Sequence, residues 1–167
     1  MNNGSIYTHI QNNIATIEFF HPASNSFPSE LLQRLTKTFE ELSINSEVKV
    51  IVLKSEKEDA FCAGASFDEL MSITNFEDGK QFFLGFANVI NAMRKCTKLI
   101  IGRVQGKVVG GGVGLAAACD YCLATEQASI KLSELTIGIG PFVIEPAVER
   151  KLGLAALSEL TLDATKW

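Results

Sequence analysis

The chain has 167 residues, enough for one domain with a sizeable buried core. Hydrophobic residues make up 47% of it and charged residues 20%, as in an ordinary globular domain, and the formal net charge is −4 without any basic stripe. This balance argues against nucleic acid and anionic membranes as partners. No apolar run is long enough to span a bilayer and residues 1–5 show no targeting pattern, so we expect a cytoplasmic location.

The first third of the sequence alternates between strand and helix patterns. Residues 6–10 and 14–20 alternate in hydrophobicity on either side of a short polar link, which predicts a β-hairpin. Residues 29–42 place leucine and phenylalanine at helical spacing opposite lysine and glutamate, which predicts an amphipathic helix. Residues 48–53 form a β-branched run that is typical of a buried strand.

The remaining two thirds of the sequence repeat this alternation. Residues 77–95 carry apolar side chains at helical spacing and predict a longer amphipathic helix. The other expected elements are a helix at 66–73, strands at 98–104, 121–125 and 129–132, a glycine-rich turn at 137–141, and helices at 143–151 and 154–162. Strand–strand–helix units around a largely parallel sheet indicate an α/β fold, in one domain that spans residues 1–167.

The glycine-rich run at residues 110–118, Gly-Gly-Gly-Val-Gly-Leu-Ala-Ala-Ala, is the most informative motif of the chain. Glycine has no side chain, so a ligand can lie directly against the main chain. The small residues after the glycines predict a tightly packed helix. Its first turn would present unpaired N–H groups and the positive end of the helix dipole. The motif therefore predicts a site for negative charge, either resting or developing during a reaction.

Three interpretations of this run compete, and the first is a dinucleotide site. Residues 112–117 match the pattern GxGxx[GA], a strand lies upstream, and Glu134 follows about 20 residues on, as the fingerprint requires. Two observations argue against it. Residues 105–109 separate the strand from the glycines, and the small apolar segment 61–65 is left without a role.

The second interpretation is that the glycines only permit close packing of helix and strand. Four glycines in five positions cost backbone entropy that a single packing contact rarely offsets. The third interpretation is an oxyanion hole built from two separated backbone N–H groups. Residues 61–65, Phe-Cys-Ala-Gly-Ala, form another strand end that opens into a helix and can supply the second donor.

These segments together resemble the crotonase superfamily of enoyl-CoA hydratases and isomerases. The likeness is carried by residues 61–65, by residues 105–120 with the glycine run, and by residues 132–138, Leu-Ser-Glu-Leu-Thr-Ile-Gly. It runs in order from about residue 6 to residue 162. The resemblance implies a spiral of ββα units, a CoA thioester as substrate, and homotrimers or dimers of trimers. It implies no metal, and no cofactor besides the CoA of the substrate.

The resemblance also assigns the site residues. Ala65 and Gly111 match the two positions whose N–H groups stabilise the enolate oxygen of the thioester. Ala23, Asn25, Phe27, Ala63 and Gly110 match the surface that binds CoA. Because proton removal or water addition beside a thioester places negative charge on its oxygen, two fixed donors and a helix dipole agree with this chemistry.

The acid–base residues divide the family. Hydratases of the best-known type carry two glutamates, whereas this sequence has Gly114 at the first position and Glu134 at the second. A single base can shift a double bond or activate water. The sequence around these positions looks closest to that of methylglutaconyl-CoA hydratase-like enzymes, which favours a hydratase. Isomerase activity is the close alternative, and decarboxylation is a third.

Other chemistry-bearing residues have weaker interpretations. His9 and His21 lie far upstream, and Ser66 has no histidine or aspartate placed to activate it, which argues against serine hydrolysis. Asp68 and Glu69 lie near the predicted site as substitutes for the missing acid. The cysteines fit buried free thiols; one pair spells CxxC without a second pair or a histidine for zinc (Cys62, Cys96, Cys119 and Cys122).

The C-terminus ends on Trp167 without a terminating signal. Family members are normally longer there, with helices that close the site and build the trimer, so we expect this C-terminal helical region to be missing. A different class also remains open: a protein that keeps the fold and binds CoA or a partner without turnover.

Overall fold

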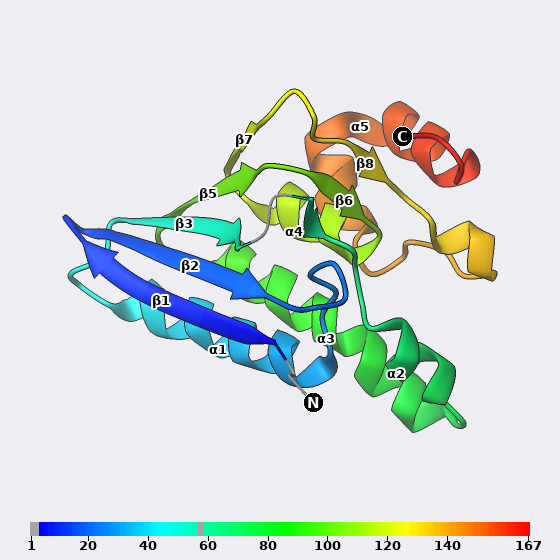
Figure 1. The fold of residues 1–167 in the computed structure, drawn as a ribbon, viewed down its shortest axis with the longest axis horizontal. Coiled ribbons are helices and arrows are strands. Elements are labelled where there is room, and N and C mark those ends of the chain that lie inside the picture. The colour runs from blue at the N-terminus through cyan, green and yellow to red at the C-terminus, as the bar shows by residue number, and fades with distance from the viewer. Residues whose placement is uncertain (1–3, 57–58) are drawn as a thin grey trace.

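Four strand–strand–helix units follow one another in the computed structural model, which describes residues 4–56 and 59–167 (Figure 1). The elements are β1 (Ser5–Gln11), β2 (Ile14–Phe20), α1 (Ser29–Ile44), β3 (Val50–Ser55), β4 (Ala60–Cys62), α2 (Phe67–Ser72), α3 (Phe76–Lys95), β5 (Leu99–Val104), β6 (Lys107–Val109), α4 (Gly111–Ala118), β7 (Tyr121–Ala124), β8 (Ile130–Lys131), a 3₁₀ helix η1 (Glu134–Ile137) and α5 (Glu145–Leu162). The repeat confirms the expected α/β fold of ββα units.

The strands form two sheets because the two strands of each unit separate from the second unit onward. The larger sheet has the order β1-β2-β3-β5-β7, antiparallel between β1 and β2 and parallel elsewhere. The smaller sheet has the order β4-β6-β8 and is parallel. Each later unit therefore adds one strand to each sheet. The successive units in this way form a spiral.

Helices α1 and α3 lie side by side against the larger sheet (Figure 1). The predicted apolar face of α1 is buried, at Leu31, Leu32, Leu35, Phe39 and Leu42. The C-terminal half of α3 is buried too, but Phe82 and Phe83 in its first half leave the core and border a cavity. The C-terminal half of α3 thus packs into the core, and its N-terminal half forms a wall of the pocket.

Two short elements escaped the sequence analysis. Residues 105–109 were expected to separate a strand from the glycines, but Lys107–Val109 is strand β6 and runs directly into Gly110. Glu134 follows strand β8, as expected, but the 3₁₀ helix η1 that it begins was not predicted. The two helices expected after residue 143 are present as one element, α5, which is broken at Gly153 with φ of 79°. None of the helices in the described ranges is long and apolar enough to cross a membrane.

Candidate active site

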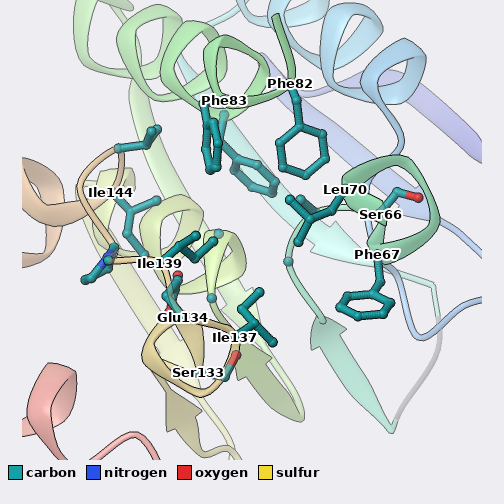
Figure 2. A pocket seen from close by; sticks show the side chains of 18 of the residues that line it. Ser66, Phe67, Leu70, Phe82, Phe83, Ser133, Glu134, Ile137, Ile139 and Ile144 are labelled. Atoms are coloured by element: carbon teal, nitrogen blue, oxygen red, sulfur yellow. The ribbon is translucent and has the colours of Figure 1, made fainter. Parts of the chain in front are cut away.

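A cavity of about 190 Å³ lies where the smaller sheet, α2, α3 and η1 meet (Figure 2). It is bordered by the residues after β4, by the start of α4, and by apolar side chains from the surrounding helices and loops. Aromatic side chains of α3 lie on one side of it and Glu134 lies on another, as Figure 2 shows. Its lining includes four of the residues assigned by resemblance, Ala63, Ala65, Gly110 and Gly111, together with Glu134.

Ala65 lines this cavity, and a bridge to Phe27 holds its backbone. Phe27 donates its N–H to the Gly64 carbonyl at 2.8 Å, and Ser66 donates its N–H to the Phe27 carbonyl at 3.0 Å. These two bonds form a parallel bridge between Phe27 and Ala65. In a parallel bridge the central residue turns its own N–H away from its partner. The Ala65 N–H therefore points away from Phe27, and it donates to no backbone acceptor in the described part of the chain.

The second backbone donor comes from the start of α4. Gly110 has φ of 53° and ψ of −123°, which only glycine adopts readily, and this turns the chain from β6 into the helix. The Gly110 N–H donates to the Lys131 carbonyl at 2.9 Å, so strand β8 holds the turn. Gly111 is the first helical residue, where an N–H has no partner within the helix.

These two segments approach each other closely. Gly64 has φ of 87°, and a Cβ built on it would lie 3.3 Å from the Gly111 nitrogen and 3.1 Å from the Val109 carbonyl oxygen. A side chain at residue 64 would therefore strain the backbone and crowd the start of α4. The absence of a side chain lets the residue before Ala65 sit against Gly111, with both donors bordering one cavity.

Packing explains why residues 111, 112 and 114 are glycines. A Cβ would lie 2.6 Å from the Phe86 ring at Gly111, 2.6 Å from the Cys62 carbonyl oxygen at Gly112, and 2.5 Å from Ile144 at Gly114. Packing therefore requires three glycines at three separate contacts, rather than at the single contact weighed in the sequence analysis. Gly112 and Gly114 lie inside a buried helix, so the match to a dinucleotide fingerprint is coincidental.

Glu134 is directed at the same place. A Cβ built on Gly110 would lie 3.3 Å from Glu134 Oε1, so the carboxylate lies beside the start of α4. Glu134 Oε2 is buried and accepts no hydrogen bond from the described residues. Burial raises the pKa of this carboxyl, and backbone N–H groups of residues 133 and 134 counter only part of that effect. Among the described residues that line the cavity, Glu134 alone has an ionisable side chain.

The position of the absent second glutamate is filled. Gly114 lies on α4 against Ile144, whose Cγ2 and Cβ would be 2.5 and 2.7 Å from a Cβ at residue 114. Ile144 itself is 3% exposed and also lines the cavity. A glutamate at residue 114 would therefore collide with Ile144, and apolar atoms occupy the space that its side chain would need.

The residues expected to bind CoA divide into two kinds. Ala23 is exposed on its loop, and Ala63 borders both the main cavity and a neighbouring hollow that Ser24 and Lys107 also line. Asn25 is buried: its Oδ1 accepts from the His21 N–H, and its Nδ2 donates to the Ala60 carbonyl, each at 2.9 Å. Phe27 is buried as well, with its ring centroid 4.9 Å from that of Phe19. The side chains of Asn25 and Phe27 thus support the loop from within.

Of the weaker candidates, Ser66 lines the cavity and the others do not. Glu69 binds Ser29 at the start of α1, and Asp68 is exposed. The thiols of Cys119 and Cys122 donate to carbonyls of α4, at 3.4 and 3.2 Å, and do not line the cavity. Within the residues that the structure describes, no group of three or more histidine, cysteine or acidic side chains is arranged to hold a metal ion.

Sequence reasoning missed the walls of the pocket. They are formed by aromatic and aliphatic side chains of α2, α3 and the loop before α5 (Phe67, Leu70, Phe82, Phe83, Phe86, Ile137, Ile139, Val143 and Ile144). The one available signal was the cluster of phenylalanines at residues 82, 83 and 86. The cluster has the same spacing as Leu31, Leu32 and Leu35 of α1, which are all buried, so spacing alone does not distinguish a pocket wall from a core face.

Comparisons with known proteins agree with this geometry. A family model described as enoyl-CoA hydratase/isomerase matches residues 9–167. The mitochondrial methylglutaconyl-CoA hydratase of Rattus norvegicus is 32% identical over 141 residues, 84% of this chain and 44% of the rat protein. The peroxisomal bifunctional enzyme of Homo sapiens is 30% identical over 135 residues, 81% of this chain and 18% of the human protein.

Solved structures share the fold. A Legionella pneumophila protein described as an enoyl-CoA hydratase/isomerase (crotonase) superposes with a TM-score of 0.90 and 30% identity. The match covers 96% of this chain and 63% of the Legionella chain. The chain thus spans less than two thirds of the length of the proteins described here.

Proposed function

The chain belongs to the enoyl-CoA hydratase/isomerase family, and from this we propose that its cavity holds the acyl group of an enoyl-CoA thioester whose double bond the protein hydrates. The observation that carries the proposal is the placement of Glu134. Its buried carboxylate, with Oε2 unpaired in the described structure, lies beside Gly110 at the N-terminus of α4. A carboxyl group with a raised pKa next to two backbone donors suits proton transfer beside a thioester.

In the proposed reaction the thioester oxygen accepts hydrogen bonds from the N–H groups of Ala65 and Gly111. Ionised Glu134 takes a proton from water while the water oxygen bonds to the β-carbon and the electrons of the double bond move to the thioester oxygen. The resulting enolate is stabilised by the two donors and the dipole of α4. Protonated Glu134 then gives its proton to the α-carbon, which restores the thioester and leaves the net addition of water.

We further propose that the remainder of CoA runs from the cavity past Ala63 toward Ala23. Ala63 borders both the cavity and the hollow that Ser24 and Lys107 line. A lysine ammonium group in that hollow suits the negative charge of the CoA phosphates. Homotrimers or dimers of trimers remain a prediction from the resemblance, and a cytoplasmic location remains a prediction from the sequence pattern.

The lining of the cavity favours an apolar acyl group. No lysine, arginine or histidine is among the described residues that border it. The distal carboxylate of a methylglutaconyl group would therefore find no positive partner there, and burying it unpaired is costly. Among the described residues that line the cavity, none would pair with this distal carboxylate.

Isomerisation is the second candidate, and the packing of Ile144 against Gly114 favours it. Moving a proton between two carbons needs one base, whereas holding water for hydration benefits from a second carboxylate, for which this site has no room.

An isotope experiment decides between the two reactions. The protein is incubated with 2-enoyl-CoA and, separately, 3-enoyl-CoA in water enriched in ¹⁸O, and the products are analysed by mass spectrometry. A hydratase yields a hydroxyacyl product that carries ¹⁸O. An isomerase interconverts the two substrates without ¹⁸O. Binding without either product would contradict both proposals and leave a CoA-binding protein.

A further inference from the structure

Hydrogen bonds between two helices lie beside the candidate site. Glu69 lies on α2, and Ser29 is the first residue of α1. The Ser29 N–H donates to Glu69 Oε2 at 2.9 Å and to Oε1 at 3.1 Å, and the Ser29 hydroxyl donates to Oε2 at 2.7 Å. A carboxylate at a helix N-terminus also interacts favourably with the helix dipole. Glu69 therefore caps α1 from a different helix.

This arrangement redirects a familiar helix-capping pattern. In a capping box, the side chain of the first residue accepts from the N–H three residues on, and the later glutamate bonds back to the first N–H. Ser66 Oγ accepts from the Glu69 N–H at 3.3 Å, which is half of the pattern. The Ser66 N–H instead donates to the Phe27 carbonyl at 3.0 Å, and the Glu69 carboxylate goes to Ser29. Pro28, the N-cap of α1, supplies no side-chain hydrogen bond of its own.

The consequence is a double connection between residues 27–29 and residues 64–69. The parallel bridge between Phe27 and Ala65 fixes one end, and the bonds from Ser29 to Glu69 fix the other. Phe27 is fully buried, so this end has a rigid base. The Ala65 N–H lies at the bridged end, directly before the start of α2.

Helix α2 has little core packing to hold it in place. It has six residues and none of them is buried, so core packing contributes little to its position. The same helix presents Phe67 and Leu70 to the cavity. Freeing its Glu69 would loosen both the wall of the cavity and the loop that carries Ala65.

We propose that Glu69 is a positioning residue, which holds the Ala65 N–H and the α2 wall of the cavity in place by its hydrogen bonds to Ser29. This inference rests on the proposed function, because it assigns Ala65 as a donor to the thioester oxygen. Glu69 does not line the cavity and acts through α2 and Ala65.

Three variants test the proposal. Glu69→Ala removes all three bonds, Ser29→Ala removes the hydroxyl bond without changing charge, and Glu69→Gln retains one carbonyl oxygen that can accept. We expect Glu69→Ala to lower kcat at least tenfold with KM within about threefold, since losing a donor outright costs about 10²–10³. Glu69→Gln and Ser29→Ala should lose less. The matched control is Glu40→Gln, which removes a carboxylate from an exposed position of α1 and should keep full activity.

Two readouts separate positioning from general destabilisation. Amide hydrogen exchange should increase at residues 65–72 in Glu69→Ala and Ser29→Ala while the core strands stay protected. The infrared carbonyl frequency of bound butyryl-CoA labelled with ¹³C at the thioester, which cannot react, should be lowered in the unsubstituted protein and return toward its free value in Glu69→Ala. Unchanged kcat and exchange at residues 65–72, exchange that increases throughout the core, or an equal loss in Glu40→Gln would overturn the proposal.

The two proposals can fail separately. If the unsubstituted protein does not lower the carbonyl frequency of bound butyryl-CoA, the assignment of Ala65 as a donor fails and the proposed function with it. In that case the hydrogen exchange of residues 65–72 still shows whether Glu69 and Ser29 hold α2. A lowered frequency that survives in Glu69→Ala contradicts the positioning role alone.

Discussion

Replacing Glu134 by glutamine removes the one ionisable side chain among the described residues that line the cavity, while its size is kept. General acid–base catalysis by a positioned side chain contributes about 10²–10⁴ in rate. With Gly114 packed on Ile144, no second carboxylate can replace it from α4. We therefore expect a loss of at least about 10²-fold in kcat for Glu134→Gln, which is roughly 3 kcal/mol or more of barrier.

Binding should respond differently. The backbone donors, the aromatic wall and the hollow beside Ala63 are untouched by Glu134→Gln, so the affinity for butyryl-CoA should stay within about threefold, under 1 kcal/mol. The assay combines turnover of 2-enoyl-CoA and 3-enoyl-CoA with calorimetric binding of butyryl-CoA. Glu149→Gln, at an exposed position on α5 that does not line the cavity, is the matched control.

Two results would contradict this reasoning. Turnover of Glu134→Gln within about threefold of the unsubstituted protein would show that another acid performs the chemistry, since so small a change is under 1 kcal/mol. Asp68→Asn would then test the exposed acid that the sequence suggests as a substitute. An equal loss of binding and turnover would show that Glu134 holds the structure of the site rather than transferring protons.

Four further predictions follow from the same geometry. Because burial raises the pKa of Glu134, kcat/KM should increase with pH through a value above the ordinary glutamate pKa, and a pH profile without this limb would contradict a base role. The raised pKa also means that ionised Glu134 destabilises the fold: the penalty is absent at pH 3 and appears as pH rises, so calorimetry should show a higher Tm for Glu134→Gln at pH 7 but not at pH 3. Gly64→Ala should cost about 1–3 kcal/mol in denaturant unfolding, because residue 64 has φ of 87° and its Cβ would crowd Gly111; a neutral result would refute this strain. Gly114→Glu should lower the free energy of unfolding by about 1–3 kcal/mol or more, and the double variant with Ile144→Ala should lose less than the sum of the two single variants if their contact is the cause.

Local patterns determined the long elements of this protein. The apolar positions of residues 29–42 and 77–95 recur at the helical period, and each segment is a helix in the structure. The hairpin predicted from the alternation of residues 6–10 and 14–20 is confirmed by the antiparallel pairing of β1 and β2. Such periodicities succeed because one buried face imposes them on contiguous residues. Strand β6, with three residues, is too short to show a period, and it was missed for that reason.

The motifs also identified the segments that form the candidate site. Residues 61–65, the glycine run and Glu134 lie around one cavity, as expected from their likeness to a family rather than from any local pattern. The role of each glycine could not be assigned from the run itself. Gly111, Gly112 and Gly114 abut Phe86, Cys62 and Ile144, whose positions in the chain are remote from the run.

The sequence by itself determined the long helices and strands, and which small-residue segments can expose backbone N–H groups. Only the tertiary structure decided which groups meet. The Ser29 N–H bonds to Glu69 across 40 residues of sequence, and Ile144 occupies the space beside Gly114 that a second glutamate would need. The unpaired Oε2 and raised pKa of Glu134 arise from burial by several elements at once. Hydrophobic periodicity indicates which side of a helix or strand is buried. Packing between distant elements determines which residues lie next to each other, and these neighbours determine the chemistry of the site.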